Sequence, residues 1–151
     1  MSLTHSPYRV SGAAAQLPGL TTLAYFAAAF FALTLLTDFA YVQTTVLMWQ
    51  DFSSWLLFFG LIAGGLATLL WVITLAFRRP RTVWSVVILN ALVLMVAFFN
   101  SLLHAGDGWT AIVPWGIGLS ALTCLLMLGS AVLRHRVLSD RPLHSDREGH
   151  R

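Results

Sequence analysis

The stretch FSSWLLFFGLIAGGLATLLWVITLAF, from Phe52 to Phe77, contains no charged residue. It is longer than the roughly 20 apolar residues that a helix needs to cross the hydrocarbon core of a bilayer. Three further apolar runs lie at about residues 20–41, 83–105 and 110–133. Because a lipid core offers no water to unpaired backbone groups, such runs are expected to be helical. The sequence therefore predicts an all-α integral membrane protein, a four-transmembrane-helix bundle over residues 20–133.

The composition indicates the same class of protein. Of the 151 residues, 58% are apolar and 10% are charged. A water-soluble domain of this length would have to expose mostly apolar side chains and would aggregate. The net charge of +3 comes from nine arginines, which all lie outside the apolar runs. We interpret them as topology signals and expect contact with the lipid bilayer and no nucleic-acid partner.

The placement of the arginines predicts the orientation. They fall in residues 1–19, in the connection between the second and third runs, and in residues 134–151. The other two connections contain Asp51 and Asp107 and no basic residue. By the positive-inside rule the arginine-bearing segments are cytoplasmic. We therefore expect a multi-pass protein of the bacterial inner membrane, with flexible cytoplasmic tails at both termini.

Small and polar residues mark the helix faces that are expected to meet inside the bundle. Gly60 and Gly64 form a GxxxG pattern, which is typical of close helix packing. Asn90 in the third run and Ser120 in the fourth lie on similar small-and-polar faces. Hydrogen bonding between helices is one interpretation of these faces, and a polar path or ligand cavity is the other.

Ionisable and aromatic residues gather at the predicted periplasmic end of the bundle. They are Asp38, Tyr41, Trp49, Asp51, Trp55, His104, Asp107 and Trp109. Tryptophan and tyrosine are expected at a membrane interface whatever the function. Asp38 and His104 are more informative, because an ionisable group on an inward face of a spanning helix is costly without a partner. We predict that His104 pairs with Asp38, the preferred partner, or with Asp107 if the following loop folds back. The pair is either an interfacial cap or a small outward-open site in which His104 changes protonation.

The sequence favours a non-catalytic protein without a metal. His104 is the only histidine within or bordering the four runs, so a haem b would need another second ligand, such as Met48. There is no zinc-binding cluster, phosphate-binding loop or Ser/His/Asp set. We expect no cofactor, and we keep quinone or haem b as alternatives.

Several strings resemble a known family. They are Leu36-Thr37-Asp38-Phe39-Ala40-Tyr41, Met48-Trp49, Asp51-Phe52-Ser53-Ser54-Trp55-Leu56-Leu57, His104-Ala105-Gly106-Asp107-Gly108-Trp109-Thr110 and Val113-Pro114. They resemble the bacterial four-helix membrane proteins called domain of unknown function 2231, over about residues 18–133. The resemblance implies an inner-membrane bundle, no established reaction and, in some relatives, an association with periplasmic sugar or aldehyde dehydrogenases. The chain departs from the family pattern at Trp71 and Thr74, where relatives tend to have a glycine followed by an aspartate.

Two functions remain open at this point. The first is a non-catalytic membrane subunit or anchor whose polar periplasm-facing site docks a periplasmic dehydrogenase or another membrane subunit. The second is a redox membrane module that binds quinone or haem b near His104 and serves a periplasmic dehydrogenase. A homo-oligomer is compatible with both functions. A transporter fits less well, because the four runs contain no deep charge and no internal repeat.

Overall fold

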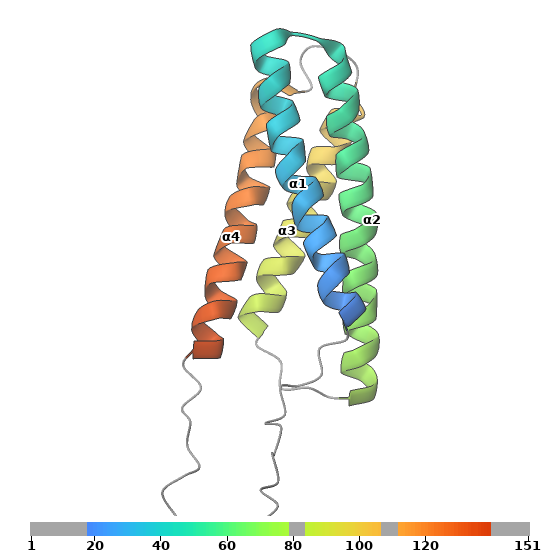
Figure 1. The fold of residues 1–151 in the computed structure, drawn as a ribbon, viewed down its shortest axis with the longest axis vertical. Helices are drawn as coiled ribbons and strands as arrows, with labels where there is room; N and C mark the ends of the chain where they lie inside the picture. The colour runs from blue at the N-terminus through green and yellow to red at the C-terminus, as the bar shows by residue number, and fades with distance from the viewer. Residues whose placement is uncertain (1–17, 79–83, 107–111, 140–151) are drawn as a thin grey trace, which may run out of the picture.

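The described residues, 18–78, 84–106 and 112–139 of a computed structural model, form four long helices arranged as a bundle (Figure 1). The helices are α1 (Pro18–Thr44), α2 (Leu47–Arg78), α3 (Trp84–His104) and α4 (Ile117–Ser139), and a π-helical turn, η1 (Ile112–Gly116), precedes α4. No strand occurs in these residues. The predicted all-α, four-helix architecture is confirmed.

Each helix is long and apolar enough to cross a bilayer. The candidate spans are Gly19–Thr44, Leu47–Phe77, Trp84–His104 and Val113–Arg136. Large apolar side chains are exposed on all four helices, for example Phe26, Phe59, Phe98 and Leu125. A helix satisfies its own backbone groups, so these surfaces can face lipid without leaving a peptide group unpaired. The chain is an integral membrane protein in contact with the lipid bilayer.

The ends of the helices define two poles of the bundle. α1 and α2 form a hairpin, and α3 ends beside the connection between them while α4 starts there (Figure 1). We call this pole the α1–α2 end. The beginnings of α1 and α3 and the ends of α2 and α4 lie at the opposite pole (Figure 1).

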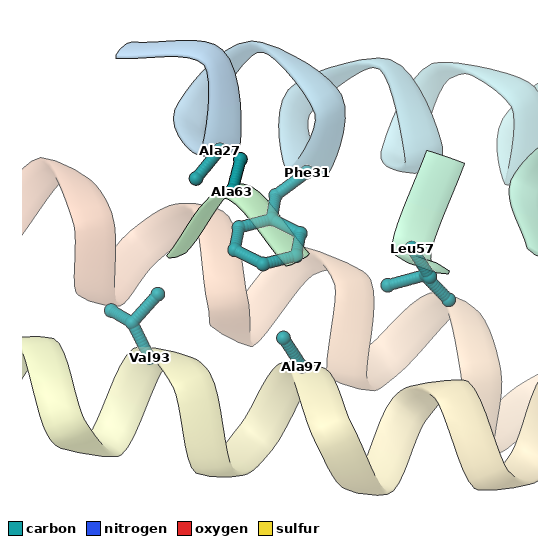
Figure 2. Close-up of a cluster of buried hydrophobic side chains, with 6 residues drawn as sticks. All are labelled: Ala27, Phe31, Leu57, Ala63, Val93 and Ala97. Carbon is teal, nitrogen blue, oxygen red and sulfur yellow. The ribbon is translucent and has the colours of Figure 1, made fainter. Parts of the chain in front are cut away.

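An apolar layer closes the middle of the bundle. It consists of Ala27, Phe31, Leu57, Ala63, Val93 and Ala97 (Figure 2). Leu126 and Met127 of α4 pack against this layer. Because each helix passes through it, polar residues at the α1–α2 end are separated by apolar side chains from polar residues nearer the opposite pole.

The GxxxG pattern of α2 faces this layer. A Cβ atom on Gly60 would lie 2.6 Å from Cε1 of Phe31, and one on Gly64 would lie 2.5 Å from Cδ2 of Leu94. A Cβ on the neighbouring Gly65 would meet no atom within 4 Å. The absence of side chains at Gly60 and Gly64 therefore lets α2 approach α1 and α3 closely.

The fourth helix differs from the predicted run of 110–133. α4 begins at Ile117, because Val113 has non-helical backbone angles (φ −113°, ψ 124°) and the residue before a proline disfavours helical angles. Pro114 also lacks the backbone N–H that a helix interior needs. At the other end α4 continues to Ser139, since arginine is a good helix former. The helix thus runs past residue 134, where the sequence predicted a tail to begin.

The other helices lie close to their predicted runs. α1 and α2 are longer than 20–41 and 52–77, because the polar residues at their ends do not break a helix, and α3 nearly coincides with 83–105. The predicted tails fall mainly on residues 1–17 and 140–151, which lie outside the described residues.

Thr45, in the connection between α1 and α2, has a left-handed backbone conformation with φ of 55°. Its N–H donates to the Tyr41 carbonyl at 2.7 Å, which caps α1 in the way that glycine usually does. A residue with a β-carbon loses about 1–2 kcal/mol in this conformation. We expect Thr45→Gly to raise the free energy of unfolding by about 1 kcal/mol, seen as a higher melting temperature in detergent. Thr44→Gly, inside α1, is the control and should lower it.

Candidate functional site

Asp38 lies at the centre of a buried polar cluster near the α1–α2 end. It precedes the end of α1 by about two turns, and its side chain has no exposed surface. An ionisable group in an apolar interior is costly unless other groups bond to it. Its own helix cannot supply those bonds, because the neighbouring backbone groups of α1 are bonded to each other. The partners therefore come from the other helices.

Three side chains on three different helices contact the Asp38 carboxyl group. Ser53 of α2 donates to Oδ1 at 2.5 Å, and Nε2 of His104 on α3 lies 2.9 Å from the same oxygen. Ser120 of α4 donates to Oδ2 at 2.5 Å. One side chain of α1 is thus bonded to each of the other three helices.

A second set of contacts holds the partners of Asp38 in place. Asn100 Nδ2 donates to Ser120 Oγ at 2.8 Å, and Nδ1 of His104 lies 3.0 Å from the backbone carbonyl of Asn100. The hydroxyls of Thr37 and Ser53 are 2.7 Å apart. Asn100 and His104 are one helical turn apart, so both face the same side of α3. The cluster is therefore a connected network of hydrogen bonds.

Among the residues that the structure describes, two buried polar side-chain atoms at this end of the bundle have no hydrogen-bond partner. They are the hydroxyl of Tyr41 and Oδ1 of Asn100. Tyr41 is 3% exposed and follows Asp38 by about one turn of α1, and Asn100 has no exposed surface. Buried polar atoms are seldom left unpaired, because the loss of water is then not compensated. Asn100 Oδ1 is the open end of the chain that runs from Asp38 through Ser120.

The structure brings together some of the residues that the sequence predicted to act jointly. Asp38 and His104 are in direct contact, and Tyr41 lies on the same buried face of α1. Asp51 is exposed, and within the described residues it forms no hydrogen bond or ion pair with any of them. Asp107 and Trp109 lie outside the described residues.

The tryptophans of the predicted cluster lie apart from the network. Trp55 is 60% exposed, and its ring packs against Phe58 and Phe59 with centroids 6.0 Å away in both cases. Trp49 is half-buried and lies 6.2 Å from Phe52. Both arrangements suit aromatic side chains at a membrane interface.

Sequence reasoning missed Ser53 and Asn100 as members of the site. Ser53 lies on the same seam of α2 as Gly60, and Asn100 precedes His104 by one turn, so the helical periodicity offered a signal for both. Ser120 was predicted only as a packing residue, but it bonds to the carboxyl group.

Asn90, also predicted as a packing residue, lies near the opposite pole. Ser130 of α4 donates to Asn90 Oδ1 at 2.7 Å, although Asn90 remains largely exposed. On α3 the buried Val93 and Ala97 separate it from Asn100 and His104. The small-and-polar face predicted for the third run is therefore interrupted by the apolar layer.

The cluster is closed in this structure. The sequence suggested a small site open to the outside, but neither Asp38 nor His104 has exposed side-chain surface, since the partners converge on the carboxyl from three sides. Ligation of a haem iron by His104 Nε2 would require this nitrogen to leave Asp38. Met48 is 54% exposed in the first turn of α2. Haem b and quinone stay predictions, and a visible absorption spectrum of the purified protein tests the first of them, because bound haem would give a Soret band.

The described residues contain no group of three or more histidine, cysteine, aspartate or glutamate side chains that could hold a metal ion. No curated protein and no solved structure matches the chain. Residues 21–144, which include every helix from the first turn of α1 to the end of α4, match the family described as predicted membrane protein (DUF2231). The four-helix bundle and the family match agree, and the chain belongs to the DUF2231 family of predicted membrane proteins.

Proposed function

We propose that this protein is a non-catalytic membrane subunit of the bacterial inner membrane that docks a periplasmic protein at its α1–α2 end. The observation that carries this proposal is the full engagement of the buried Asp38–His104 pair. Both oxygens of Asp38 and both ring nitrogens of His104 have partners inside the bundle. In this arrangement the pair therefore offers no free base, nucleophile or metal ligand to a substrate, and its bonds hold four helices together.

The surface of the α1–α2 end supports a docking role. Val46, Leu47 and Met48 are 46%, 55% and 54% exposed in and beside the short connection between α1 and α2. Connections at the ends of membrane helices usually carry polar residues, because they meet water and lipid headgroups. Exposed apolar side chains such as these three are suited to a contact with another protein. The family resemblance suggests a periplasmic dehydrogenase as the class of partner.

The charges at the opposite pole support a periplasmic placement of this end. Arg134 and Arg136 are exposed on the last turns of α4, and α2 ends at Arg78. Basic residues at helix ends favour the cytoplasmic side. A reporter fused after Arg136 is therefore expected to behave as cytoplasmic, and one inserted at Thr45 as periplasmic.

Site-specific photo-crosslinking in cells of the source bacterium tests the docking proposal. A photoreactive amino acid at Leu47 or at Met48 should give an adduct with one and the same periplasmic protein, identified by mass spectrometry. Phe77 is the matched control, because it is 85% exposed on the same helix but at the opposite pole. It should give no adduct with that protein.

Two results would contradict the proposal. The first is that Leu47 and Met48 form adducts only with lipid or with a second copy of this chain. The second is that the same protein is captured equally well from Phe77, since its contact would then not be specific to the α1–α2 end.

A further inference from the structure

The hydrogen bonds of His104 determine how many protons the Asp38–His104 pair holds. Nδ1 of His104 contacts the Asn100 carbonyl, which can only accept, so Nδ1 carries a hydrogen. Nε2 lies 2.9 Å from Asp38 Oδ1, and two bare lone pairs would repel at that distance. One further proton must therefore lie between Nε2 and Oδ1. With this shared proton the pair has no net charge.

The surroundings of the carboxyl group indicate where the shared proton resides. Ser53 and Ser120 both donate to the carboxyl, one to each oxygen. Together with His104 they make three donors, which is the environment of an ionised carboxylate. The resting pair is accordingly an aspartate and an imidazolium.

The chain from Asp38 through Ser120 to Asn100 can run in either direction. At rest Asn100 Nδ2 donates to Ser120 Oγ, and Ser120 donates to Asp38 Oδ2. If Oδ2 carries a proton, it can donate to Ser120, and Ser120 can then donate to Asn100 Oδ1 after the amide turns over. Oδ1 has no partner at rest, so it is free to accept. Both directions contain the same number of hydrogen bonds.

The cluster lies near the α1–α2 end, and apolar side chains separate it from the opposite pole. On α3, Val93 and Ala97 come after Asn90, which bonds to Ser130, and before Asn100 and His104. Both pack with Phe31 in the apolar layer (Figure 2). Thr34 precedes Asp38 by about one turn of α1, and Thr123 follows Ser120 by about one turn of α4. Their hydroxyls donate to the carbonyls of Phe30 and Leu119 on their own helices. These two hydroxyls therefore do not continue the hydrogen-bonded chain from Asp38 through the apolar layer.

Few other ionisable groups face the pair among the described residues. Tyr41 follows on α1, and Cys124 of α4 has its Sγ 3.8 Å from the Phe31 carbonyl. The nearest acid on α2, Asp51, is exposed, and α3 contributes only His104. Asp38 is the only buried carboxyl group in the described ranges.

We propose that the Asp38–His104 pair is a one-sided proton-binding site. A proton from the α1–α2 side adds to Asp38 Oδ2 and converts the carboxylate to a carboxylic acid, so the charge of the pair changes from zero to +1. The chain through Ser120 reverses, and Asn100 Oδ1 becomes its acceptor. This role is independent of whether a periplasmic protein docks at the same end.

Infrared spectroscopy of the full-length protein in liposomes, from neutral to acidic pH, tests the site. We expect acidification to produce the carbonyl band of a hydrogen-bonded carboxylic acid. Asp38→Asn should remove this band, which comes from one of the six side-chain carboxyl groups of the protein. Ser120→Ala should move this band to higher frequency, because the acid loses its acceptor. Asp51→Asn, which changes an exposed carboxyl, should leave the band in place.

The proposal is overturned if wild type and Asp38→Asn acquire the same acid bands while circular dichroism shows intact helices. If Asp38→Asn does not fold, the infrared spectra of wild type and Ser120→Ala are compared instead, both with aspartate labelled with carbon-13. A shifted band between these two proteins supports the site, and coincident bands exclude it.

Discussion

Replacing Asp38 with alanine is expected to lower the free energy of unfolding by about 3–5 kcal/mol, the range found when one partner of a buried ion pair is removed. The substitution leaves an imidazolium buried without its counter-charge, and it takes the acceptor away from Ser53 and Ser120. Thermal unfolding in detergent, followed by circular dichroism, measures the effect. Asp51→Ala is the matched control, since this aspartate is exposed, and its effect should stay within about 0.5 kcal/mol.

A double-mutant cycle separates the charge from the hydrogen bonds. A hydrogen bond between membrane helices contributes only about 0.6 kcal/mol on average, so the lost hydroxyl contacts cannot account for the expected loss alone. Adding His104→Ala to Asp38→Ala should recover part of the stability, because the unpaired cation is then gone. If Asp38→Ala melts like Asp51→Ala, the cluster does not hold the helices together.

The fold was predictable because the bilayer permits few alternatives. A run such as 52–77 without a charge is too long for a buried strand and can satisfy its backbone in lipid only as a helix. The start of α4 was less predictable. Residues 110–133 are apolar throughout, and hydropathy alone does not register that Val113 and Pro114 interrupt the helix.

The Asp38–His104 pair was also predictable, because an unpaired ionisable group inside a spanning helix has a high free-energy cost. Asp38 and His104 each lie near the end of a spanning helix on a face with small residues, and each needs a partner there. The contact of the hydroxyl donors with the carboxyl group was not predictable, because periodicity places Ser53 and Ser120 only on faces that ordinary packing residues also occupy. Whether they point at a carboxyl depends on the rotation of α2 and α4 about their axes, which periodicity gives only relative to each helix itself.

The second large effect is expected at Gly60. Gly60→Leu should lower the melting temperature more than Gly64→Leu does, although both leucines would enter a crowded space. At Gly60 the obstacle is the ring of Phe31, which is 2% exposed and packed in the apolar layer. At Gly64 it is the end of the Leu94 side chain, which is half-buried and can change rotamer. Overpacking costs about 1–3 kcal/mol in cores that can adjust, and more where they cannot.

Gly65→Leu on the same helix provides the control, because a side chain at this position meets open space. The same chemical change there gains up to about 1 kcal/mol of helix propensity, so its melting temperature should stay equal or rise. We expect the loss of stability to be largest at Gly60, smaller at Gly64 and absent at Gly65. This order follows how little the side chain that each new leucine meets can move. An equal loss at Gly65 would instead mean that leucine disturbs α2 regardless of its neighbours, and the close approach of α2 to α1 would then not depend on the glycines.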